Sequence, residues 1–92
     1  MSALYGFAYA DAALKYLETS VSAKIRGQIK RIIESLATNA NPPGSKKLQT
    51  ITDGEAPVFR VRSGDYRILY VIRNNPDQIV VLDIGHRKDV YR

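Results

Sequence analysis

The residues of this sequence that could take part in chemistry are mostly cationic and lie in its second half. Arginine carries a planar guanidinium that binds phosphate through two parallel hydrogen bonds and stays charged. Histidine can move protons near neutral pH because its ordinary pKa is about 6.5. Tyrosine can donate a hydrogen bond or stack on an unpaired base. The candidates are Arg60, Arg62, Arg67, His86, Arg87 and Tyr91, with Lys46 and Lys47 upstream.

These residue types match the needs of metal-free RNA cleavage. The 2′-hydroxyl must lose a proton, the charge on the phosphate must be stabilised, and the leaving oxygen must gain a proton. Arginine suits the second task and histidine suits the other two. Each residue also has a plainer interpretation, since His86 could be a surface residue at a strand end, and Arg60 and Arg62 could form a solvated sheet face. Residue types alone therefore predict a basic binding surface and nothing narrower.

Other kinds of site have no counterpart in the sequence. There is no phosphate-binding loop and no dinucleotide-binding glycine pattern. With one histidine and no cysteine, the chain has no recognisable metal site and no disulfide. Ser63 lies in a predicted turn without the glycines of a nucleophile elbow. We therefore expect no metal and no cofactor.

Length and charge limit the class of protein. A chain of 92 residues predicts a single domain over residues 1–92. The formal net charge of +5 favours a polyanionic partner, and basic residues concentrate after residue 60. No secretion signal and no apolar run of membrane-spanning length is evident, so we expect a cytoplasmic protein that does not enter the membrane.

The first half of the chain predicts a strand and two helices. Residues 4–9 alternate in the manner of a short strand, and Asp11 is a candidate N-cap for a helix of about two turns. Ser20 or Ser22 can cap a second helix, whose apolar residues recur at spacings of three and four until Leu36. Two prolines and a glycine end it, and residues 39–57 are expected to form an irregular connector.

The second half predicts an antiparallel meander. Three β-rich runs, at residues 58–62, 66–73 and 79–84, are separated by short turn sequences. The predicted order is therefore β-α-α-β-β-β, an α+β fold in which a helical hairpin packs on a twisted antiparallel sheet. Alternation along the strands would bring Arg60, Arg62 and Arg67 to one exposed face if the pairing register allows it.

The meander and the C-terminal motif resemble a known family. The stretches SGDYRILYVI and IVVLDIGHRKDVYR, together with the predicted element order, resemble the RelE/ParE superfamily of toxin–antitoxin toxins, and are closest to the RelE-type mRNA interferases. The resemblance implies a RelE-like fold and metal-independent, ribosome-dependent cleavage of translated mRNA, which inhibits translation. It also implies a cognate acidic antitoxin as partner, with operator DNA bound only through the antitoxin complex.

The resemblance implies roles for individual residues. Arg67 and Arg87 would stabilise charge on the scissile phosphate, Tyr91 would orient the nucleotide, and His86 would transfer a proton. A lysine that some members use in catalysis falls on Val58, so the identity of the general base stays open. The backbone of the RNA would be held by Arg60, Arg62, Lys46 and Lys47.

Two alternatives accompany this hypothesis. ParE-like members share the fold but act on DNA gyrase without cutting RNA, and fold does not determine function. The loss of the lysine at Val58 also allows a degenerate domain that binds its antitoxin and has no catalytic activity.

Overall fold

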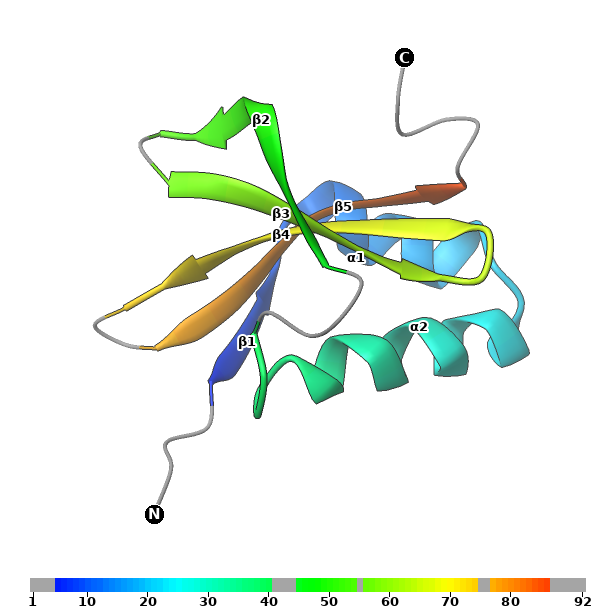
Figure 1. Ribbon diagram of the computed structural model, residues 1–92. Coiled ribbons are helices and arrows are strands. Elements are labelled where there is room, and N and C mark those ends of the chain that lie inside the picture. The colour runs from blue at the N-terminus through cyan, green and yellow to red at the C-terminus, as the bar shows by residue number, and fades with distance from the viewer. Residues whose placement is uncertain (1–4, 41–44, 55, 75–76, 87–92) are drawn as a thin grey trace.

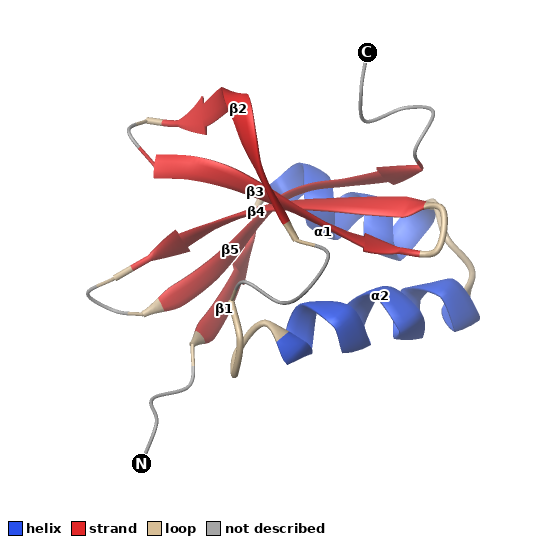
Figure 2. Ribbon diagram, viewed as in Figure 1, coloured by secondary structure: helices blue, strands red, loops and turns tan. Residues whose placement is uncertain are grey.

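The computed structural model describes residues 5–40, 45–54, 56–74 and 77–86, and side chains within these ranges except those of residues 49–53. Two helices cover one side of a five-stranded sheet (Figures 1 and 2). In chain order the elements are β1 (Gly6–Tyr9), α1 (Asp11–Thr19), α2 (Ala23–Ser35), β2 (Lys46–Asp53), β3 (Ala56–Ser63), β4 (Tyr66–Arg73) and β5 (Gln78–His86).

The helices begin close to the predicted residues. Ser22 is the N-cap of α2, where its hydroxyl accepts a hydrogen bond from the Ile25 amide at 3.3 Å. The N-cap of α1 is Ala10, and the predicted cap Asp11 is instead the first helical residue. A carboxylate in the first turn still interacts favourably with the helix dipole. The Nε of Arg26 donates to the Leu17 carbonyl at 2.8 Å, which joins the start of α2 to α1.

The sheet is mixed, whereas the prediction was an antiparallel sheet. Its strand order is β1-β5-β4-β3-β2, and β3, β4 and β5 form the predicted antiparallel meander. However, β1 pairs in parallel with β5, with Phe7 opposite Ile79 and Tyr9 opposite Val81. This pairing joins the two ends of the described chain, and local sequence patterns carry no information on such distant partners.

The predicted irregular connector at residues 39–57 is partly wrong, because residues Lys46–Asp53 form the edge strand β2. β2 pairs with β3 through Lys46 and Lys47 at one end and through Thr52 and Asp53 at the other, with a register irregularity between them. The polar composition that suggested a loop is also common at sheet edges, where lysines discourage pairing with other chains. Pairing with β3 therefore decided the outcome here.

Apolar residues pack on both faces of the sheet. The larger cluster lies between the sheet and the helices and includes Leu17, Ile33, Val61, Ile68 and Tyr70. A smaller cluster on the opposite face consists of Val58, Leu69 and Val71, with Leu48, Ala56, Val80 and Leu82 packed against it. Within the described part of the chain, neither helix has the length and apolar character needed to cross a lipid bilayer.

Candidate nucleic-acid interface

Strand register brings four cationic residues to one face of the sheet. Arg62 lies opposite Arg67, and Lys46 lies opposite Arg60. Directly opposed residues point to the same side, and so do residues two apart on one strand. We call Lys46, Arg60, Arg62 and Arg67 the basic face. It lies on the side of the sheet away from the helices, because the neighbouring residues Phe59, Val61 and Ile68 belong to the helix-side core.

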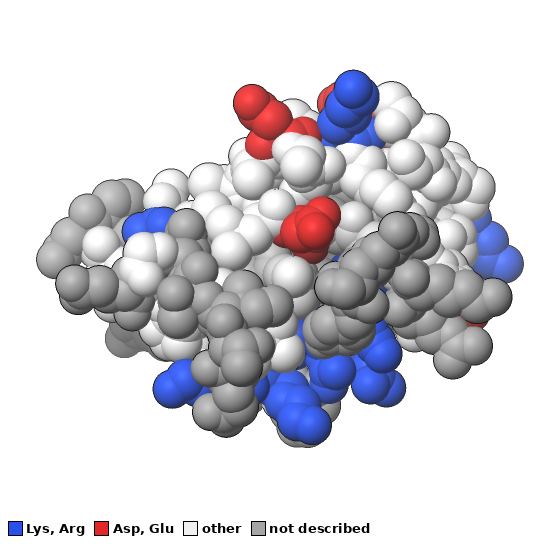
Figure 3. Space-filling model, turned by 90° about the horizontal axis from the view of Figure 1, so that it is seen from above, with Lys and Arg blue, Asp and Glu red and all other residues white. Residues whose placement is uncertain are grey.

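The four side chains of the basic face differ in exposure. Lys46 and Arg62 are exposed, whereas Arg60 and Arg67 are half-buried and their Nε atoms are covered. Both half-buried arginines also take part in interactions within the protein. A guanidinium held in this way loses less conformational freedom when it binds phosphate than a fully solvated side chain does. Seen from above, Lys and Arg side chains gather along the lower border of the molecule (Figure 3).

Lys47 does not belong to the basic face. It pairs with Phe59, which in turn pairs with Tyr70, and both aromatic residues lie on the helix side of the sheet. Its side chain is exposed at the sheet edge. The structure therefore separates the two lysines that the sequence analysis grouped as RNA-binding, because adjacent strand residues point to opposite faces.

His86 also lies on the helix side. It pairs with Tyr66, and their rings meet edge to face with centroids 5.5 Å apart. Tyr66 contacts Tyr16 of α1 in a similar geometry at 6.5 Å. The residue opposite Arg67 on β5 is Gly85, so the arginine and the imidazole point to opposite faces. The structure thus does not bring His86 to the basic face, and the other two predicted catalytic residues, Arg87 and Tyr91, lie outside the described residues.

One carboxylate that the sequence analysis did not select borders the basic face. Asp83 lies opposite Leu69, which lies opposite Arg60, so its exposed side chain shares their side of the sheet. Its Oδ1 accepts a hydrogen bond from the Ile84 amide at 2.9 Å. Alternation along the sequence does not reveal the position of Asp83, because the pairing of β5 with β4 shifts between Asp83, opposite Leu69, and Val81, opposite Tyr70.

Val58 gives no polar group to this face. Its side chain is 0% exposed and packs with Leu69 and Val71. Among residues 5–40, 45–54, 56–74 and 77–86, no group of three or more potential metal ligands comes together.

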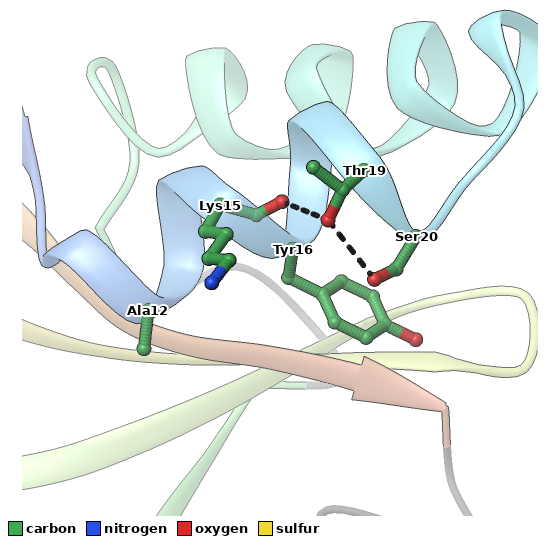
Figure 4. A pocket seen from close by; sticks show the side chains of 5 residues that line it. All are labelled: Ala12, Lys15, Tyr16, Thr19 and Ser20. Atoms are coloured by element: carbon green, nitrogen blue, oxygen red, sulfur yellow. Dashed lines mark hydrogen bonds between the residues drawn. The ribbon is translucent and has the colours of Figure 1, made fainter.

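A shallow hollow of about 250 Å³ lies on the helix layer and was not predicted (Figure 4). Its lining comes from α1, between the second and the last residue of that helix, and from the residue that follows it. The Tyr16 ring points from the helix toward the end of β5. Thr19 Oγ1 donates to the Lys15 carbonyl at 2.7 Å and lies 3.4 Å from Ser20 Oγ. The lining residues are Ala12, Lys15, Tyr16, Thr19 and Ser20.

Comparison with known proteins agrees with this architecture. A family model described as the ParE toxin of the parDE type II toxin–antitoxin system matches residues 8–91. Because this model covers most of the chain, the chain belongs to the RelE/ParE superfamily of type II toxins. No curated protein matches it.

Solved structures give the same result at the level of the fold. The RelB–RelE complex from Methanococcus jannaschii is 31% identical, with a TM-score of 0.64 over 91% of this chain and 94% of that chain. The archaeal RelE–RelB complex from Pyrococcus horikoshii is 21% identical, with a TM-score of 0.76 over 95% and 99%. The E. coli RelBE complex is 22% identical, with a TM-score of 0.65 over 89% and 95%. The chain is thus a toxin of the RelE type, and the predicted α+β class is confirmed.

Proposed function

We propose that this toxin is an endoribonuclease that cleaves translated mRNA on the ribosome, and so inhibits translation. The observation that carries the proposal is the basic face, in which the register of three adjacent strands gathers Lys46, Arg60, Arg62 and Arg67. Four cations on one sheet face suit the backbone of a single-stranded RNA.

The half-buried arginines suit the reaction itself. Charge accumulates on the phosphate oxygens during attack by the 2′-hydroxyl, and a positioned guanidinium stabilises it more than a mobile one does. Arg67 takes this role within the described residues, and the proposed mechanism gives Arg87 the same role. Tyr91 orients the nucleotide, and Lys46, Arg60 and Arg62 hold the RNA backbone. Lys47 lies on the other side of the sheet edge and contributes through its charge alone.

Proton transfer needs a group that can bind and release a proton beside the RNA. His86 has suitable chemistry, but it lies with Tyr66 on the helix side of the sheet. The basic face itself carries Lys46, and Asp83 borders it. His86 is the last residue of β5. The proposed mechanism therefore assigns proton transfer to His86 only where the RNA passes around this end of the strand.

The proposed partner is a cognate acidic antitoxin. The solved relatives from Pyrococcus horikoshii, Methanococcus jannaschii and E. coli are toxins in complex with RelB antitoxins. An acidic segment that folds on binding would complement the basic face and block access of RNA to it. Co-expression with the neighbouring gene product, followed by affinity purification, tests this, and a failure to co-purify at low and moderate salt would argue against it.

A second function, inhibition of DNA gyrase, is favoured by one observation. The family model that matches residues 8–91 is that of the ParE toxin, and the resemblance to ParE-like members implies gyrase as the target. The buried Val58, in place of a lysine that some members use, is consistent with either this function or a non-catalytic domain.

The discriminating experiment is brief induction in bacteria followed by mapping of mRNA 5′ ends. The chains compared are the wild type, Arg67→Gln, Arg87→Ala and, as a matched control, Arg31→Gln on the exposed side of α2. New cuts in frame within translated regions, lost in the first two variants and kept in the third, would support the nuclease.

The other outcomes also separate the alternatives. Growth arrest with intact mRNA would point to gyrase, and a DNA supercoiling assay would follow. Neither arrest nor cleavage by a folded, antitoxin-free chain would indicate a non-catalytic domain.

A further inference from the structure

Tyr70 makes an unusual pair of contacts in the centre of the sheet. Its side chain is 0% exposed, yet it carries a hydroxyl that must find a partner. The ring stacks on Phe59 of the neighbouring strand with centroids 5.7 Å apart. The hydroxyl donates to the carbonyl of Ala40, beyond the end of α2, at 2.6 Å.

The same hydroxyl also shares a hydrogen bond with the side chain of Ser45. Burial raises the pKa of Tyr70, and a side-chain hydrogen bond with Ser45 acts in the opposite direction. A phenol can donate one hydrogen bond and accept others, so it can serve both neighbours at once. Ala40 and Ser45 are the described residues on either side of positions 41–44. One hydroxyl in the core therefore contacts Ala40, which follows α2, and Ser45, which precedes β2.

The position of Ser45 affects the start of β2, because Lys46, the first residue of that strand, follows it directly. β2 pairs with β3 at this end through Lys46 and Lys47, after which the register is irregular. Two paired residues thus set the register at the start of the strand. The row Lys47–Phe59–Tyr70 runs across three strands, and the next row places Lys46 beside Arg60 on the basic face.

We infer that Tyr70 is a positioning residue for the basic face: by holding Ala40 and Ser45 from the core, its hydroxyl determines where Lys46 enters the sheet beside Arg60. The assignment of an RNA-binding role to Lys46 rests on the proposed function. The positioning itself does not, because it is a property of the folded chain.

The test is a double-mutant cycle with Tyr70→Phe and Lys46→Gln. Phenylalanine keeps the ring and its stacking on Phe59 and removes only the hydroxyl. Binding of an end-labelled, single-stranded oligoribonucleotide of mixed sequence is measured by fluorescence anisotropy at low salt. Because the two changes act through one contact, we expect each alone to weaken binding by about threefold to tenfold, and the pair to weaken it no more than the stronger single change.

Two matched controls accompany the cycle. Arg62→Gln removes a cation from the same face at the far end of β3, so its effect should multiply with that of Tyr70→Phe. Tyr9→Phe removes a phenol hydroxyl from a residue that packs against the same core and should leave RNA binding unchanged. In a wild type that binds RNA, independent effects of Tyr70→Phe and Lys46→Gln, or an unchanged affinity in Tyr70→Phe, would overturn the inference.

Hydrogen exchange separates this inference from the proposed function. In Tyr70→Phe without RNA, we expect the amides of Lys46 and Lys47 to exchange at least several-fold faster, while those of Val61 and Arg62 keep their protection. If the wild-type chain neither binds RNA nor cleaves translated mRNA but this change in exchange is seen, the proposed function fails and the positioning role stands. Unchanged exchange at Lys46 and Lys47 would reject the positioning role regardless of any RNA result.

Discussion

Arg62 and Arg67 lie directly opposite each other on β3 and β4. Like charges at opposed positions destabilise a sheet by a few tenths of a kcal/mol to about 1 kcal/mol. Such an arrangement makes physical sense where an anion bridges the two guanidinium groups. We therefore expect the pair to lower stability in the free protein and to strengthen binding of an anionic partner.

This exchange between stability and binding can be measured. We expect Arg62→Gln to raise the free energy of unfolding by about 0.2–1 kcal/mol and to weaken RNA binding. Urea denaturation and fluorescence anisotropy give the two quantities. The control Arg31→Gln removes the same charge from the exposed side of α2 and should change neither. A destabilised Arg62→Gln would show that Arg62 supports the sheet in a way that the opposed charges do not explain.

Because His86 and Arg67 lie on opposite faces of the sheet, we also predict different roles for them. Loss of Arg67 should lower the rate of mRNA cleavage by about 100-fold or more, as for the removal of a charge-stabilising donor. His86→Gln keeps a planar polar side chain against Tyr66. If His86 only packs on Tyr66, this variant keeps most of the activity and loses some thermal stability.

A pH–rate profile distinguishes the two possibilities for His86. If its imidazole transfers a proton, His86→Gln removes one limb of the profile. If the profile keeps its shape, His86 is a structural residue, and proton transfer belongs to another group.

Buried phenols give the protein a dependence on alkaline pH. Burial raises the pKa of Tyr70 and, together with the charge of Glu34, that of Tyr9, above the ordinary value of 10.0. The folded state therefore holds these protons more tightly than the unfolded state does. Their contribution to stability is fully present below the unfolded pKa and is lost as the pH rises through the folded pKa.

The pH prediction uses Tyr70→Phe as its own control. Urea unfolding from about pH 8 to about pH 11 should show the wild type losing stability more steeply than Tyr70→Phe, since both chains have the same lysines. Parallel curves would mean that the phenol titrates alike in the folded and unfolded states.

At the scale of elements, local patterns predicted what is local. The spacing of Ile25, Ile29 and Ile33 along α2 and the alternation in β3, β4 and β5 were sufficient for helix and meander, because each pattern reports one buried face. The edge strand β2 and the parallel pairing of β1 were missed, because both depend on partners distant in sequence or on an irregular register. The same limit applies to the site. Arg60, Arg62 and Arg67 could be grouped from alternation, whereas the places of Lys47, Asp83 and His86 required the observed register.

The start of α2 offers a prediction at this scale. The Ser22 hydroxyl caps the helix by accepting a hydrogen bond from the Ile25 amide. Ser22→Ala should lower the free energy of unfolding by about 1 kcal/mol. Ser35→Ala, in the same helix, removes a hydroxyl that donates to the Ile32 carbonyl at 2.6 Å and should have a smaller effect. Equal effects in thermal or urea unfolding would show that the cap contributes nothing specific.

At the scale of the whole molecule, charge is divided between two surfaces. The basic face lies on one side of the sheet, and Lys24, Lys30 and Arg31 are exposed on α2 in the layer on the other side. The net charge of +5 alone would attract RNA to either surface. Salt dependence separates them, because each phosphate contact with single-stranded RNA contributes about 0.7 to the slope of log affinity against log salt.

Substitutions by glutamine on the two surfaces therefore give different slopes. Each of Lys46→Gln, Arg60→Gln and Arg62→Gln should reduce the magnitude of the slope by about 0.7, whereas Lys24→Gln and Arg31→Gln should leave it unchanged although they remove equal charge. Equal reductions on both surfaces would mean that RNA binds through diffuse charge, and the basic face would lose its special role. A slope near zero for the wild type would remove phosphate contacts from the mechanism, and would leave the gyrase hypothesis as the stronger one. The comparison thus asks whether a face assembled by strand register, rather than total charge, recognises the RNA.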